Sequence, residues 1–222
     1  MNRRQIKLVI ILIIAVIALV LAIIGLKNIK VDEFKPASVI FVIDSSASNQ
    51  KKLSTQINTL KTICKRLDPE DHIKIIRVSE DAYLIYEGHA HATGAISKSL
   101  NEFTKYSAEE YGTAYGEGIT KAINYSKNMQ KENYVPAIVV IGDLENEGNA
   151  EKQINWSKLP AQIKQAQKEI PELSMTFLYA HPQKLDRVKE LLSPVLGEEK
   201  LVIATEQNTD NAIKKFILAI GR

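Results

Sequence analysis

Short apolar runs and helix-like repeats alternate along the chain from residue 37 onward. The runs at 39–43 and 137–141 contain no polar residue, which is typical of strands buried on both faces of a parallel sheet. The predicted strands are residues 39–43, 73–78, 82–86, 137–141, 175–180 and 201–204. Apolar residues spaced by three and four predict helices at about 50–67, 96–103, 119–129, 159–170, 185–192 and 210–220. This alternation predicts an α/β domain whose parallel sheet is covered by helices on both faces.

One edge of the sheet has a different direction. Only Ser79, Glu80 and Asp81 separate the predicted strands 73–78 and 82–86. A connection this short predicts an antiparallel hairpin. We therefore expect a mostly parallel sheet with one antiparallel edge strand, which is a common mixed arrangement.

Residues 8–26 form an apolar run of 19 residues with no charge and no proline. Such a run is long enough to cross a bilayer as a helix. It is also longer than the apolar part of a cleaved signal peptide, and no small-x-small cleavage site follows it, so an uncleaved anchor is favoured. The predicted organisation is a tail at 1–7, a transmembrane helix at 8–26, a linker at 27–36 and a domain at 37–222.

The orientation of this predicted single-pass membrane protein rests on basic residues that stand on both sides of the span. They are Arg3, Arg4 and Lys7 before it, and Lys27, Lys30 and Lys35 after it. The balance leans toward an N-terminus inside the cell and a domain outside the cytoplasm.

The net charge of +3 comes from the N-terminal segment, because Arg3, Arg4, Lys7 and Lys27 carry four of the 29 basic charges. The rest of the chain has a net charge of about −1 and no basic stripe, so a nucleic-acid partner is not indicated. The single cysteine, Cys64, excludes an intramolecular disulfide. Its place on the apolar face of a predicted helix indicates a small buried hydrophobic residue.

Candidate chemistry begins where the first strand ends, at Asp44, Ser46 and Ser48. In open α/β sheets the ligand lies just beyond the carboxyl ends of the strands. The alternate spacing lets three oxygens turn toward one point, and hard oxygen ligands suit a small divalent cation such as Mg²⁺. Asp and Ser are also ordinary turn and helix-capping residues, so this motif alone is weak.

Two further segments supply oxygen ligands. The buried strand 137–141 ends in Gly142 and Asp143, and an acidic loop follows. A glycine-rich stretch at 111–118 contains Thr113, and its glycines would let the backbone approach a neighbouring site closely. Its spacing fits neither common phosphate-binding pattern. The candidate metal ligands are therefore Asp44, Ser46, Ser48, Thr113 and Asp143.

This set of residues resembles a von Willebrand factor type A domain, over about residues 36–222. The resemblance rests on the strand followed by Asp44-x-Ser46-x-Ser48, on Gly112-Thr113 before a helix, and on the strand that ends at Asp143. It implies a doubly wound, Rossmann-like sheet of six strands with one antiparallel edge. It also implies a metal-ion-dependent adhesion site at the end of that sheet.

By this resemblance, Ser46 and Ser48 coordinate Mg²⁺, or Mn²⁺ or Ca²⁺, through their hydroxyls. Thr113 joins directly or through water, and Asp44 and Asp143 act mostly through bridging waters or hydrogen bonds. A cation touched by few carboxylates keeps a position that can accept an acidic residue of a protein partner.

The sequence departs from the family's pattern in the loop after Asp143. Leu144 stands where glycine is common in the family. Glu145 and Glu147 lie near the expected rim of the site, where they could tune the site or compete for the ion.

Three functions fit these residues. The favoured one is a membrane-anchored protein, not an enzyme, that binds a protein partner through the metal site in adhesion or complex assembly. The second is a Mg²⁺-dependent hydrolase or phosphoryl-transfer enzyme that uses Asp44 or Asp143. No nucleophile elbow and no triad-like histidine supports it. The third is a structural adaptor with an unused metal site, since a fold does not fix a function.

Overall fold

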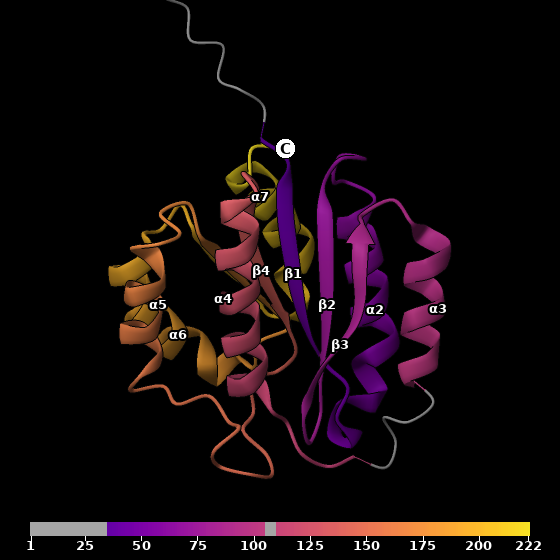
Figure 1. The fold of residues 1–222 in the computed structure, drawn as a ribbon. Coiled ribbons are helices and arrows are strands. Elements are labelled where there is room, and N and C mark those ends of the chain that lie inside the picture. Colours follow the sequence, from indigo (N-terminus) through magenta and orange to yellow (C-terminus); the bar gives the residue numbers. More distant parts are fainter. Residues whose placement is uncertain (1–34, 105–109) are drawn as a thin grey trace, which may run out of the picture. The chain divides into compact units, whose positions relative to one another are not determined.

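A six-stranded sheet forms the centre of the domain, in the order β3-β2-β1-β4-β5-β6 (Figure 1). The structure is a computed structural model, and it describes residues 35–104 and 110–222. The strands are β1 (Ala37–Asp44), β2 (His72–Val78), β3 (Ala82–His89), β4 (Val135–Ile141), β5 (Ser174–Leu178) and β6 (Leu201–Ile203). Only the pair β2–β3 is antiparallel. The predicted mixed sheet with one antiparallel edge is thus confirmed.

Helices cover both faces of the sheet, as predicted (Figure 1). One face carries α2 (Gln50–Cys64), α3 (Thr93–Thr104) and α7 (Thr209–Ala219), and the other carries α4 (Tyr115–Lys131), α5 (Leu159–Gln167) and α6 (Pro182–Leu196). Strand β1 shows why. Val39, Phe41 and Ile43 pack in the first core and Ile40 and Val42 in the second, because successive side chains point to opposite faces.

The helices differ in detail from their predicted ranges. Helix α4 begins at Tyr115, within the glycine-rich stretch and before the predicted start at residue 119, and the Tyr115 side chain is fully buried. Cys64 lies on α2 and is buried, as its pattern predicted. Burial raises the pKa of its thiol to about 12, so the thiol stays protonated and inert at neutral pH.

Membrane attachment was predicted for the N-terminal segment. No helix within residues 35–104 and 110–222 is long and apolar enough to cross a membrane. The predicted tail at 1–7 and span at 8–26 lie outside the described residues, as does the linker except for Lys35 and Pro36. These boundaries stay predictions.

The chain returns to the start of β1 after α7. Gly221 has a φ of 75°, a left-handed conformation that glycine adopts at little cost. The Gly221 N–H donates to the Leu218 carbonyl at 3.1 Å and the Arg222 N–H donates to the Ile217 carbonyl at 2.9 Å. This pair of bonds is the Schellman turn that often ends a helix. It directs the Arg222 side chain toward the start of β1.

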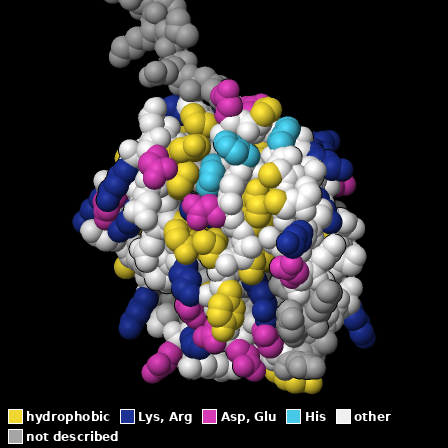
Figure 2. All heavy atoms as spheres, turned by 45° about the vertical axis from the view of Figure 1, so that its right-hand side comes forward, with side chains coloured by type: hydrophobic (Ala, Val, Ile, Leu, Met, Phe, Trp, Pro, Cys, Tyr) yellow, Lys and Arg dark blue, Asp and Glu magenta, His cyan; other side chains and the backbone are white. Residues whose placement is uncertain are grey.

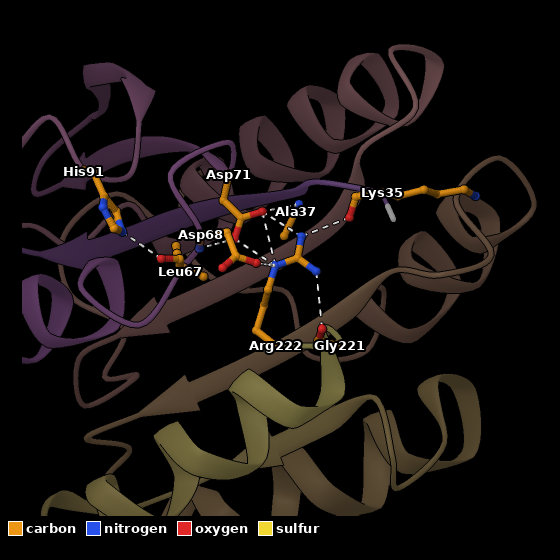
Figure 3. Close-up of polar contacts among 8 residues, drawn as sticks. All are labelled: Lys35, Ala37, Leu67, Asp68, Asp71, His91, Gly221 and Arg222. Atoms are coloured by element: carbon orange, nitrogen blue, oxygen red, sulfur yellow. Dashed lines mark hydrogen bonds and ion pairs between the residues drawn. The ribbon is translucent and has the colours of Figure 1, made fainter. Parts of the chain in front are cut away.

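Arg222 and Asp71 form a buried ion pair at the beginning of β1 (Figure 3). The Arg222 Nη2 lies 2.7 Å from the Asp71 Oδ1, and its Nε lies 2.9 Å from Oδ2. The same carboxylate accepts the Ala37 N–H at 2.6 Å, and Arg222 also donates to the Lys35 carbonyl at 2.9 Å. Asp68 adds a second acidic partner at 3.0 Å. One guanidinium therefore joins the start of β1, the loop before β2 and the segment after α7.

Replacing Arg222 with glutamine should destabilise the domain strongly. The Asp71 carboxylate is fully buried and would lose its cation, and breaking such a pair typically costs about 3–5 kcal/mol. We expect the urea midpoint of unfolding to fall accordingly. Lys214→Gln, on the exposed side of α7, is the matched control and should change stability by less than about 0.5 kcal/mol. Equal midpoints for the two variants would contradict this role of Arg222.

Candidate metal site

Strands β1 and β4 are parallel neighbours that end at the same level, with Ile43 opposite Ile141. This register brings Asp44 and Asp143 to one edge of the sheet, at the lower end in Figure 1. Gly142 makes their approach possible. A Cβ at position 142 would lie 2.7 Å from the Asp44 Cβ and 1.8 Å from the Tyr115 hydroxyl oxygen, and the Gly142 φ is 154°. Only glycine fits between these side chains.

The Asp44 carboxylate is almost fully buried. Its Oδ1 accepts the Ser46 N–H at 2.8 Å, and its Oδ2 accepts the Tyr115 hydroxyl at 3.0 Å. Burial raises the pKa of Asp44 to about 6; the neighbouring Asp143 carboxylate also raises it, while the bonds from Ser46 and Tyr115 lower it. No basic side chain of the described residues forms an ion pair with this carboxylate. A nearby cation would favour its ionised form.

The two serine hydroxyls of the first motif lie side by side. The Ser46 and Ser48 Oγ atoms are 3.0 Å apart. Ser46 is buried and Ser48 is exposed, so the pair extends from the interior to the surface. The Ser48 hydroxyl donates to Oε2 of Glu147 at 2.8 Å. These two adjacent hydroxyl oxygens, just beyond the carboxyl end of β1, could act together as ligands of a cation.

Thr113 belongs to the same edge. Its N–H donates to the Glu147 carbonyl at 3.0 Å, and the next N–H, of Ala114, donates to the Ser79 carbonyl at 2.7 Å. These bonds join the glycine-rich stretch to the loop after β4 and to the end of β2. The structure therefore brings the three segments that carry Asp44, Ser46, Ser48, Thr113 and Asp143 together.

Asp143 forms the same turn as Asp44. Its Oδ1 accepts the N–H two residues on, from Glu145, at 2.9 Å, and its carbonyl accepts the His181 N–H at 3.0 Å. The turn places Leu144 at a φ of 64° with its side chain fully buried. Glycine would adopt this φ without strain, whereas Leu144 gains buried apolar surface that offsets the cost. This conformation gives a physical reason for the glycine that is common here in the family.

Several supporting residues were missed in the sequence. Asn49 and Gln56 form a buried reciprocal amide pair, with N–O distances of 2.7 and 3.0 Å. Asn49 also donates to the Asp44 carbonyl at 2.9 Å, so the pair fixes the motif loop to α2. One signal was available, because Gln56 is a polar residue within the apolar stripe of Leu53 and Leu60.

Arg77 hydrogen-bonds to the loop that carries Ser46 and Ser48, through Ser45. Its Nε donates to the Ser45 hydroxyl at 3.0 Å, its Nη2 donates to the Ser79 hydroxyl at 3.0 Å, and its guanidinium pairs with Glu110. The Glu110 carbonyl in turn accepts the Ala47 N–H at 2.7 Å. A buried arginine in a strand gave no sequence signal of this role, because its partners come from distant segments.

The donor set fits a hard divalent cation. Its members are three hydroxyls and two carboxylates, all oxygen. The carboxylate of Asp44 is buried, and the part of the chain that the structure describes gives it no basic partner. Among the described residues no group of three or more His, Cys, Asp or Glu side chains could hold a metal. A cation at this edge would therefore depend on the hydroxyls of Ser46, Ser48 and Thr113. Metal binding by the five residues stays a prediction.

The surroundings of the site are charged. Figure 2 shows acidic side chains at the lower end of one face, with basic side chains among them. Two of the acids in the loops at this end are paired: Asp81 with Lys152, and Glu145 with Lys184 at 3.0 Å.

Comparisons with known proteins agree with this architecture. The family model described as von Willebrand factor type A domain matches residues 39–149, which is half of the chain and includes all five candidate ligands. No curated protein matches the chain by sequence.

Solved structures share the fold at low sequence identity. The conserved hypothetical protein BatB from Bacteroides thetaiotaomicron is 16% identical, with a TM-score of 0.58 over 82% of this chain and 98% of its own. An aerotolerance-related membrane protein from Bacteroides fragilis is 17% identical, with a TM-score of 0.55 over 83% and 98%. The pilus adhesin SpaC from Lactobacillus rhamnosus GG is 11% identical, with a TM-score of 0.61 over 85% of this chain and 31% of the adhesin.

Gly142→Ala should destabilise the domain. The added methyl group would displace the Tyr115 hydroxyl from Asp44, and overpacking of this kind costs about 1–3 kcal/mol. Gly94→Ala is the matched control. A Cβ there meets nothing within 4 Å, and alanine restricts the unfolded chain more than glycine does, so the change should be neutral or slightly stabilising. Urea unfolding should therefore show a loss of stability for Gly142→Ala alone, and a tolerated alanine at position 142 would contradict the close packing of the two strand ends.

Proposed function

The chain belongs to the von Willebrand factor type A domain family, and on that premise we propose that it binds a protein partner through a divalent cation. Domains of this family are generally interaction modules, not enzymes. The observation that carries the proposal is the pair of adjacent hydroxyls, Ser46 and Ser48, in front of the buried carboxylate of Asp44.

In this proposal each of the five residues has a role. The hydroxyls of Ser46, Ser48 and Thr113 would hold Mg²⁺ or Mn²⁺, while Asp44 and Asp143 orient the donors and supply negative charge. The bond from the Ser46 N–H to Asp44 supports this division, because it fixes the loop that carries both serines. The bound cation would supply a Lewis-acid position for an oxygen of the partner.

An acidic side chain is the partner chemistry that suits such a site. Hydroxyls are neutral ligands, so a cation held mainly by them keeps most of its charge and attracts a carboxylate. Neutral serine and threonine side chains make up three of the five proposed ligands. We therefore propose that the partner contributes an Asp or Glu side chain.

The proposed site and the beginning of the domain lie at opposite ends of β1. The chain enters at Lys35, beside the start of β1, and the site lies at the other end of that strand. Eight residues of strand span about 26 Å at roughly 3.3 Å per residue, so the two ends are well separated. A membrane anchor at residues 8–26, as the sequence predicts, fits a role in adhesion or complex assembly outside the cytoplasm, and the likeness to a pilus adhesin and to a membrane protein supports it.

The metal is the first part to test. Isothermal titration of the domain with Mg²⁺ and Mn²⁺ should show one site. Ser46→Ala removes one oxygen ligand of the cation and should weaken binding by about tenfold, the scale of one hydrogen bond to a charged group. Asp44→Asn should weaken it by a similar factor because the site loses a full charge. Ser54→Ala, an exposed serine of α2, is the matched control and should bind like the parent.

Partner capture then separates the proposal from an adaptor that uses another face. Chelator should release the partner of the parent protein captured from native membranes, and Ser46→Ala should not capture it. Capture that persists in both cases would contradict a metal-dependent interface, as would a parent domain that binds neither cation.

A further inference from the structure

Glu147 is joined to two of the three segments that form the metal site. Its Oε2 accepts the Ser48 hydroxyl at 2.8 Å, and its backbone carbonyl accepts the Thr113 N–H at 3.0 Å. Residues 48 and 147 are 99 positions apart, so the fold alone brings this carboxylate to the serine.

The loop that carries Glu147 is packed closely against the glycine-rich stretch. Gly148 has a φ of 77°, and a Cβ there would lie 2.9 Å from the Gly112 Cα. The Gly148 carbonyl accepts the Gln153 side chain at 3.0 Å. Asn146 is bonded to the backbone of Ile154 in both directions at 3.2 Å. The backbone on either side of Glu147 is therefore held in place.

The charge of Glu147 is directed at the site. Among the described residues no basic side chain lies within ion-pair distance of it. Glu145, two residues earlier, instead pairs with Lys184 at 3.0 Å. The two acids of one loop therefore differ, because one is neutralised by a lysine and the other faces a proposed metal ligand.

We propose that Glu147 is a built-in carboxylate that competes with the partner's acidic side chain for the cation. This inference rests on the proposed function, and it deepens it by assigning a residue that sets how strongly a partner binds. A carboxylate beside the site attracts the cation and repels a second carboxylate. Glu147 therefore strengthens metal binding and weakens partner binding, and a partner's acid has to displace it.

The test compares the parent domain with Glu147→Gln and with Glu190→Gln, an exposed acid on α6, as the matched control. Glutamine keeps the size of the side chain and can still accept the hydrogen bond from the Ser48 hydroxyl, so only the charge is removed. Titration calorimetry with Mn²⁺ gives the metal affinity of each protein. Acetate, as the carboxylate probe, is then added to the Mn²⁺-loaded proteins, and the relaxation rate of water protons reports its binding at the metal.

For Glu147→Gln we expect Mn²⁺ to bind about three- to tenfold more weakly. Acetate should bind more tightly, with its midpoint concentration lower by a similar factor. This is about the scale of one hydrogen bond to a charged group. Glu190→Gln should match the parent in both measurements, and urea unfolding should show all three proteins folded. Weaker Mn²⁺ binding together with tighter acetate binding identifies competition, since a merely distorted site would weaken the binding of both.

Two results would overturn the inference. If the parent binds Mn²⁺ and Glu147→Gln matches Glu190→Gln, Glu147 has no role at the metal while the proposed function stands. If the parent binds no Mn²⁺, the proposed function is wrong and the inference falls with it.

Discussion

Buried carboxylates stand at both ends of β1, and the domain compensates them in different ways. At the start of the strand, Asp71 is fully buried and receives the guanidinium of Arg222 together with the Ala37 N–H (Figure 3). At the end of the strand, Asp44 receives an N–H from Ser46 and a hydroxyl from Tyr115, but no basic side chain from residues 35–104 or 110–222. Moving a charged side chain out of water costs free energy, on the order of several kcal/mol, unless a partner compensates it. The charge of Asp71 is therefore compensated within the domain, whereas the surroundings of Asp44 have the chemistry to receive a cation.

The parallel arrangement of β1 and β4 makes the second end possible. Their shared register sets Asp44 and Asp143 at one level, and Gly142 allows the close approach. The two acids form the same local turn, each accepting the N–H two residues ahead. The end of β1 therefore supplies Asp44, while the loops supply Asp143, the hydroxyls and the carboxylate of Glu147 that faces them. This division is the usual one in α/β proteins, where loops on a fixed scaffold carry function.

The family match ends at residue 149, but the sheet does not. Strands β5 and β6 continue it in parallel, and α5, α6 and α7 complete its two faces. The last segment also contributes Arg222, which closes the joint at the start of β1. The second half of the chain therefore holds the first strand in place from the end opposite the site. The likeness to BatB, over 98% of that protein, extends across both halves.

The sequence by itself determined the layers of the fold. Five-residue apolar runs such as 39–43 are typical of strands inside a covered sheet, and the three-residue connection 79–81 is too short for a parallel crossover. The strand types and the antiparallel edge therefore followed from local pattern. The five candidate ligands were also visible, because strand ends and glycine-rich turns are local features.

Only the tertiary structure decided what surrounds those ligands. Tyr115, Asn49 and Gln56 act on Asp44 through contacts between different elements, and Glu147 reaches Ser48 across 99 positions. A hydrogen bond over such a separation depends on the register of the sheet and the path of each loop, which no local pattern contains. The same reason hid the pairing of Arg222 with Asp71, since a charged residue carries no mark of the partner that the fold will bring to it.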